Sequence, residues 1–233
     1  MQQAWTREEF MERLLEVGNR AYHHLHPFHL RMNEGTLDAD SIRLWVANRY
    51  YYQRSIPMKD AAILSNCPIQ EVRRKWIRRI IDHDGQQRQE GGLEKWIRLS
   101  IACGLTREET ISEKHVRPGV RIAVDAYVNF ARVQPWPIAI ASSLTELFAP
   151  ELMSKRLDAF AKFYPWIAPG GLDYFRARLT QAKKDSDFAL STTFEYCADR
   201  KTQEAAVEAL RFKCSMLWQM LDALAIVVPV NSQ

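Results

Sequence analysis

The spacing of apolar residues is the feature of this sequence that most restricts its fold. Along most of the chain, apolar side chains recur three and four positions apart, which is the period of an amphipathic helix and not of a strand. Helix breakers are few, because only nine glycines and ten prolines interrupt 233 residues. The pattern therefore predicts one all-helical domain over residues 1–233, with no strands, no internal repeat and no dividing linker.

Capping and breaking residues place the predicted helices. Two Thr-x-x-Glu segments, beginning at Thr6 and Thr106, have the spacing of capping boxes that open a helix. Pro57 lies inside the helix predicted over residues 40–66, where its ring and missing N–H predict a kink one turn earlier. Gly85 is expected to end the next helix. The other helices are predicted over residues 68–84, 92–103, 118–133, 137–161, 171–184, 186–198 and 201–227, with a short one after Thr106.

Charge and cysteine content exclude several classes of function. Lys plus Arg number 32 against 28 Asp plus Glu, a net charge of +4 that is too small to indicate a nucleic-acid partner. The four cysteines lie far apart with no CxxC pair, which favours buried free thiols in a reducing compartment over disulfides or zinc. The most apolar run, 223–230, is far shorter than the ~18 residues of a membrane span, and no signal sequence is evident. We expect a cytoplasmic protein without a membrane partner.

Several basic residues share a helix face with apolar residues, although solvated faces are where lysine and arginine usually lie. Arg49, Arg79, Arg178 and Lys213 are the clearest cases, and they come from segments far apart in the sequence. Each one alone is also consistent with a side chain whose charged end reaches water. Buried together, they would each cost several kcal/mol unless an anion compensated them. We therefore expect a cavity for a ligand with several carboxylates, because guanidinium fits carboxylates and no glycine-rich phosphate loop is present.

The histidines raise the question of a metal site, because four of the six lie between residues 22 and 29. His23 and His26 are one turn apart and could bind a metal as a pair. However, no third ligand of suitable spacing is evident, and the sequence has none of the Glu-x-x-His pairs of di-iron bundles. We therefore expect no metal.

Specific segments carry a resemblance to a known family. They read Trp45-Val-Ala-Asn-Arg-Tyr-Tyr-Tyr-Gln53, Ile56-Pro-Met-Lys-Asp60, Arg79-Ile-Ile-Asp-His-Asp-Gly85, Ser142-Ser-Leu-Thr-Glu-Leu-Phe-Ala-Pro150 and Tyr174-Phe-Arg-Ala-Arg178. The likeness ends near Lys213, so it covers nearly the whole chain. In these segments the sequence resembles the pyrroloquinoline quinone synthases, the PqqC family.

The resemblance implies a compact, haem-oxygenase-like bundle of about seven helices that acts as a homodimer. It also implies the final step of pyrroloquinoline quinone synthesis, in which a quinoid tricarboxylate precursor undergoes ring closure and oxidation by O2. That reaction needs no metal or organic cofactor and releases peroxide. Two alternatives remain open, a non-catalytic carrier of the precursor or product and a metal-dependent oxidase of the same fold.

Matching segments also imply roles for individual residues. Catalytic roles are expected for His83 as general acid or base, for Tyr174 and Arg178 beside the oxygen site, and for Lys213. The expected substrate-binding residues are Tyr22, His23, Arg49, Gln53, Lys59, Arg79, Tyr127, Thr145, Glu146, Met153 and Arg156. Met153 departs from the family pattern, which usually has a histidine there. Because methionine cannot shuttle a proton, late oxidation steps are expected to be slow in this chain.

Overall fold

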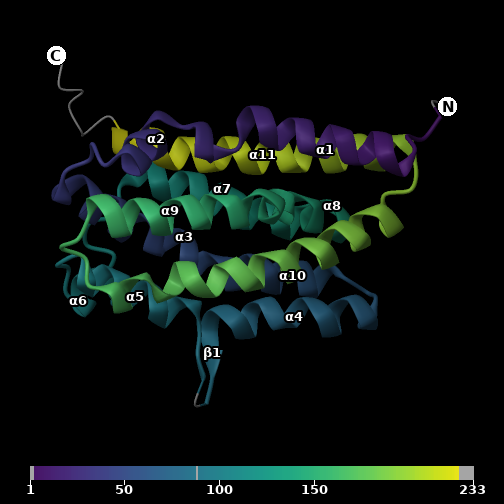
Figure 1. Ribbon diagram of the computed structural model, residues 1–233. Helices are drawn as coiled ribbons and strands as arrows, with labels where there is room; N and C mark the ends of the chain where they lie inside the picture. The colour runs from purple at the N-terminus through teal and green to yellow at the C-terminus, as the bar shows by residue number, and fades with distance from the viewer. Residues whose placement is uncertain (1–2, 88, 226–233) are drawn as a thin grey trace.

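The computed structural model describes residues 3–87 and 89–225 and confirms the all-helical fold class (Figure 1). Its α-helices are α1 (Arg7–Ala21), α2 (Pro27–Glu34), α3 (Ala39–Asn66), α4 (Gln70–Asp84), α5 (Gly92–Ala102), α6 (Arg107–Ile111), α7 (Pro118–Val133), α8 (Trp136–Ala141), α9 (Ala149–Phe163), α10 (Asp173–Tyr196) and α11 (Arg200–Ala225). Three 3-10 helices are η1 (His23–Leu25), η2 (Ser142–Phe148) and η3 (Pro169–Leu172). The described residues thus form more helical segments than the seven or so that the resemblance implied.

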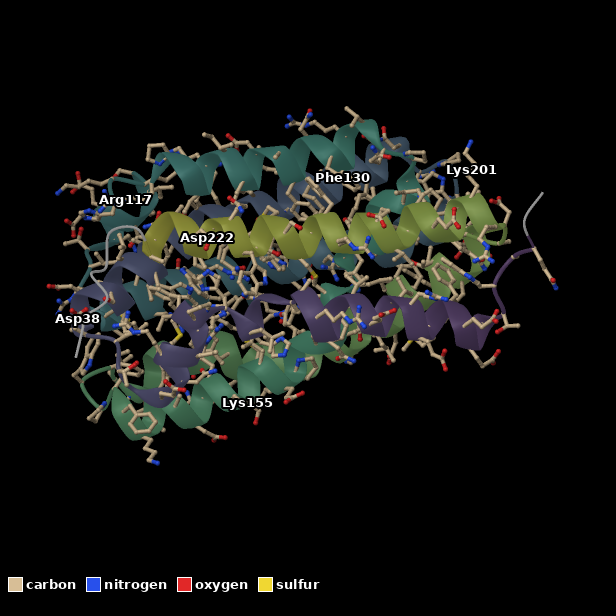
Figure 2. All side chains as sticks on the ribbon, turned by 90° about the horizontal axis from the view of Figure 1, so that it is seen from above. Asp38, Arg117, Phe130, Lys155, Lys201 and Asp222 are labelled. Carbon is tan, nitrogen blue, oxygen red and sulfur yellow. The ribbon has the colours of Figure 1, made fainter. Side chains whose placement is uncertain are left out.

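The helices are stacked in layers. Figure 1 shows α1, α2 and α11 on one side, α3, α7, α8 and α9 in the middle, and α4, α5 and α10 on the other side. Helices α1 and α11 run in the same direction, because Trp5 bonds Gln203 near their starts, while His26, just after α1, bonds Asp222 near the end of α11. From above, α11 with Asp222 lies between α7 with Phe130 and the α1 side of the molecule (Figure 2).

Local sequence signals placed most helix ends correctly. Both capping boxes are formed, at Thr6 and at Thr106, and α3 continues through Pro57. Helix α4 ends before Gly85, whose positive φ of 83° is accessible to glycine at little cost. The predicted end of the last helix at residue 227 lies outside the described residues.

Three features differ from the predictions. The helix predicted over 137–161 is divided into α8, η2 and α9, and Pro150, in the first turn of α9, has no N–H to bond the carbonyl of Glu146 across the last junction. The two helices predicted over 171–184 and 186–198 are one helix, α10, which no glycine or proline interrupts. Finally, the sequence predicted no strand, but β1 (Gly85–Gln86) pairs antiparallel with β2 (Gln89–Glu90) in a short hairpin.

An aromatic core fixes the central helices around the site. Trp45 of α3 packs against Trp96 of α5 and Phe175 of α10, with ring centroids 5.5 and 6.4 Å away. Phe160 of α9 completes the group at 6.4 Å from Trp45. Such large buried rings contribute much of the apolar burial and lock the helices that carry the site. All four cysteines are buried and free, as predicted. No described helix is long and apolar enough to cross a membrane.

Candidate functional site

A small cavity, lined mostly by buried residues, lies where the predicted site residues meet. Its volume is about 30 Å³, which has room for a water molecule or two but not for a ring system. Nine predicted residues line it, and these are Tyr22, His23, Arg49, His83, Thr145, Glu146, Met153, Tyr174 and Arg178. They come from η1, α3, α4, η2, α9, α10 and the residue before η1. The protein therefore closes around its own side chains at this point.

The remaining predicted residues lie directly behind this lining. Gln53 accepts a 2.9 Å hydrogen bond from the Tyr174 hydroxyl, and Lys213 donates one of 2.8 Å to Tyr52. The other four, each buried, are Lys59, Arg79, Tyr127 and Arg156. The structure thus brings together all the residues that the sequence nominated, in two shells around one cavity.

On one side of the cavity, buried arginines are paired with carboxylates of the same chain. Glu146 lies between Arg178, at 2.6 Å, and Arg79, at 3.4 Å. Asp185 lies 3.2 Å from each of the same two arginines. Burial alone would raise the pKa of Glu146, but Arg178 and Arg79 outweigh that effect and lower it to about 2. Deeper in the core, Asp60 pairs with Lys59 and accepts from Trp76 at 3.0 Å. This side is therefore electrically compensated.

On the other side, three cations have no carboxylate partner among the described residues. These are Arg49, Arg156 and Lys213, and aromatic rings cover them instead. Arg49 lies over Tyr52 at 4.1 Å, and the Lys213 ammonium lies 3.5 Å from the Tyr127 ring centroid. The Nε and Nη2 atoms of Arg156 have no hydrogen-bond partner. Arg156 and Lys213 are buried and Arg49 is partly buried, and buried positive charge of this kind needs an anion.

The lack of a counter-ion affects the pKa values of Lys213 and Arg156. Burial lowers the pKa of Lys213 well below its usual value, and nearby Lys59 and Arg49 lower it further. Burial, together with Arg49, lowers the pKa of Arg156 to about 9. Both shifts show the same direction, a weaker preference for the charged form, and a bound anion would raise both pKa values again.

His83 lies on the cavity wall in a defined tautomer. Its Nδ1 lies 3.0 Å from the backbone carbonyl oxygen of Arg79, and because a carbonyl only accepts, Nδ1 must carry the proton. The lone pair is then on Nε2. Burial, and then the charge of Arg178, lower the pKa of His83 to about 4, so the imidazole is neutral near pH 7. A neutral imidazole with a free lone pair can accept a proton.

His23 and His26, the pair considered for a metal, have different neighbours in the structure. The His23 ring lies 4.7 Å from that of His29, whereas His26 bonds Asp222 and packs on Trp218 at 4.8 Å. The described residues contain no cluster of three or more His, Cys, Asp or Glu side chains arranged to hold a metal ion. The two histidines that the sequence suggested as a pair thus face different neighbours.

Sequence reasoning missed several residues of the site. Tyr52, Ile56, Ala149 and Leu217 line the cavity, and the carboxylates of Asp60 and Asp185 neutralise its arginines. Tyr52 could have been found, because it lies three positions after Arg49 on the same face of α3. Asp185 carried no signal, since an acidic residue in a polar helical segment is usually solvated.

Fold and site together define an all-helical protein with a haem-oxygenase-like architecture, closed around a cluster of buried cations. The solved structures that it resembles include a TenA homologue from Pseudomonas syringae pv. tomato, with a TM-score of 0.76, 12% identity and coverage of 97% of this chain and 99% of that chain. A domain of unknown function with a heme oxygenase-like fold from Shewanella denitrificans has a TM-score of 0.75, 11% identity and coverage of 94% and 90%. These similarities concern the fold alone.

The chain belongs to the TENA/THI-4/PQQC family, whose model matches residues 11–223. It is 53% identical over 223 residues to a Pseudomonas aeruginosa protein named pyrroloquinoline-quinone synthase, covering 96% of this chain and 89% of that protein. A Cronobacter sakazakii protein of the same name is 52% identical over 230 residues, covering 99% and 91%. The resemblance inferred from the sequence segments is confirmed.

Proposed function

We propose that this chain catalyses the reaction for which these relatives are named, the ring closure and O2-dependent oxidation that yields pyrroloquinoline quinone. The observation that carries the proposal is the set of three cations without a carboxylate partner among the described residues, Arg49, Arg156 and Lys213, beside the cavity. A tricarboxylate precursor supplies the negative charges that these cations lack. Each close charge pair would contribute about 4 kcal/mol at an effective dielectric constant of ~20.

The other groups have roles that follow from their geometry. Nε2 of His83 is free to accept a proton from the substrate ring. Gln53 orients the Tyr174 hydroxyl, and Arg178 lies nearby to stabilise negative charge that develops on oxygen. A quinoid substrate can deliver electrons to O2 itself, so we propose no metal or organic cofactor. A homodimeric state and a cytoplasmic location are part of the same proposal.

The reaction test uses the purified chain with the tricarboxylate precursor in excess chelator. In air we expect pyrroloquinoline quinone and peroxide to form together, and under argon no complete oxidation. Precursor that is unchanged after hours in air would refute the proposal. Activity that is lost on chelation and restored by iron would instead support a metal-dependent oxidase.

Met153 favours one second candidate, a carrier that binds the quinone without completing turnover. This methionine is buried and lines the cavity where a proton donor is expected in the family. A carrier would bind pyrroloquinoline quinone tightly and leave the precursor unoxidised. The same two measurements, binding and turnover, therefore separate the candidates.

A further inference from the structure

A second, larger hollow opens beside the site, between α4 and α10. Its volume is about 580 Å³, whereas the volume of the cavity at the site is about 30 Å³. Figure 1 shows the two helices along the same side of the molecule, next to the β1–β2 hairpin. We call this hollow the α4–α10 cleft. Its volume is sufficient for a small molecule with several rings.

The α4–α10 cleft is positively charged. Five cationic side chains line it, against two acidic ones, Asp82 and Asp185. Arg78 of α4 and Lys184 of α10 line the cleft, are exposed, and have no ion-pair partner among the described residues. Unpaired charges on the walls of a cleft raise the local concentration of oppositely charged ligands and their association rates.

Ion pairs connect residues that line the cleft with residues that line the cavity. Arg79 and Asp185 line the cleft, and the same Arg79 contacts Glu146, which lines the cavity. Arg178, on the cavity wall, contacts Asp185 on the cleft wall. One layer of four ion-paired side chains therefore lies between the cleft and the cavity.

Asp185 is the less firmly held of the two carboxylates in that layer. Asp185 contacts Arg79 and Arg178 through a single oxygen, which lies 3.2 Å from each. Glu146 uses one oxygen for Arg178, at 2.6 Å, and the other for Arg79, at 3.4 Å. Burial raises the pKa of Asp185 above its usual value, although the charges of Arg79 and Arg178 act in the opposite direction. By contrast, the pKa of Glu146 is lowered to about 2.

We propose that the α4–α10 cleft recruits the polycarboxylate ligand and that Asp185 is an internal counter-ion, which a ligand carboxylate displaces from Arg79 and Arg178 on entry. The arginines stay paired before and after the exchange, so their buried charge is compensated throughout. This inference rests on the proposed function, because the ligand carries several carboxylates. It adds to that function the route by which the ligand enters and the carboxylate, that of Asp185, which the ligand displaces.

The first test measures how fast pyrroloquinoline quinone associates, by stopped-flow quenching of tryptophan fluorescence. We expect Arg78→Glu/Lys184→Glu to slow association about tenfold or more in low salt, with a deficit that shrinks in high salt. The matched control is Arg132→Glu/Lys201→Glu, which makes the same charge change at two exposed residues outside the cleft. Equal association rates in the two double variants would overturn the role of the cleft.

The second test concerns Asp185→Asn, with Asp187→Asn on the same helix as control, since Asp187 is exposed. Without its counter-ion, the free Asp185→Asn protein should melt at a lower temperature, and pyrroloquinoline quinone should raise its Tm by more than it raises that of the control. A purely structural role would lower the Tm of free and bound protein alike, and that result would overturn the displacement. If Asp185→Asn does not fold, the proposal is decided by the association rates of pyrroloquinoline quinone with the two double variants. Wild-type protein that fails to bind the quinone would refute the proposed function itself.

Discussion

The Nδ1–H group of His83 donates a hydrogen bond of 3.0 Å to the carbonyl oxygen of Arg79, one turn earlier in α4. This bond fixes the ring orientation and leaves Nε2 as the proton acceptor at the cavity. The backbone that carries Arg79, a residue of the ion-pair layer, thus also sets the tautomer of the proposed base. Binding of a polyanion would raise the pKa of His83 from about 4 toward the working pH.

Replacing His83 by alanine should separate binding from proton transfer. We expect His83→Ala to slow proton-dependent oxidation about 10²- to 10⁴-fold, the usual contribution of a positioned acid or base. Affinity for pyrroloquinoline quinone should change little, because the unpaired cations remain. Single-turnover absorbance and a fluorescence titration measure the two quantities. His115→Ala, at a half-exposed histidine bonded to Glu109, is the control, and a rate equal to that control would exclude His83 as the base.

Met153 can be tested by restoring a proton donor. If this methionine limits peroxide protonation, Met153→His should accelerate the late oxidation phase, while Met153→Leu, with similar volume and no ionisable proton, should not. Rapid-scanning spectroscopy of one turnover resolves the phases. An unchanged late phase in Met153→His would mean that protons reach oxygen by another route.

Two buried arginines of the site should respond oppositely to the same substitution. Arg79→Met leaves the carboxylates of Asp60, Glu146 and Asp185 short of a partner, so it should cost about 3–5 kcal/mol of unfolding free energy. Arg156→Met removes an unpaired charge and should leave stability equal or higher, but weaken quinone binding by about 2–5 kcal/mol. Urea unfolding and binding titrations measure both. Comparable destabilisation by the two substitutions would show that Arg156 has an internal counter-ion.

Acidification should destabilise the empty protein through its buried histidines. Burial lowers the pKa of His23 and His29 well below 6.5, and that of His83 to about 4. Between pH 6.5 and 4 the unfolded chain therefore binds more protons than the folded one, and the unfolding free energy falls as the pH falls. His83 alone accounts for roughly 3 kcal/mol over this range.

Urea unfolding at a series of pH values between about 7 and 5 measures this slope. His83→Gln removes one of the three groups, so its stability should depend less steeply on pH than that of the wild type. His115→Gln again provides the control. A His83→Gln protein with the wild-type slope would show that folding does not lower the pKa of His83.

The amino-acid sequence by itself determined the helical class, most helix ends and the buried state of the cysteines. These follow from apolar periodicity, capping boxes and breakers, which act within a few residues. The sequence also nominated the cations of the site, because Arg79 and Lys213 share helix faces with apolar residues that must be buried.

Only the tertiary structure decided how those charges are arranged. It placed Asp185 of α10 against Arg79 of α4, left Arg156 without a counter-ion, and brought the α4–α10 cleft to the edge of the cavity. It also divided the predicted helix over 137–161, so that Glu146 lies in η2 and reaches two arginines. The physical reason is that a helix face depends on residues three and four apart, whereas charge compensation depends on distances between residues remote in the chain.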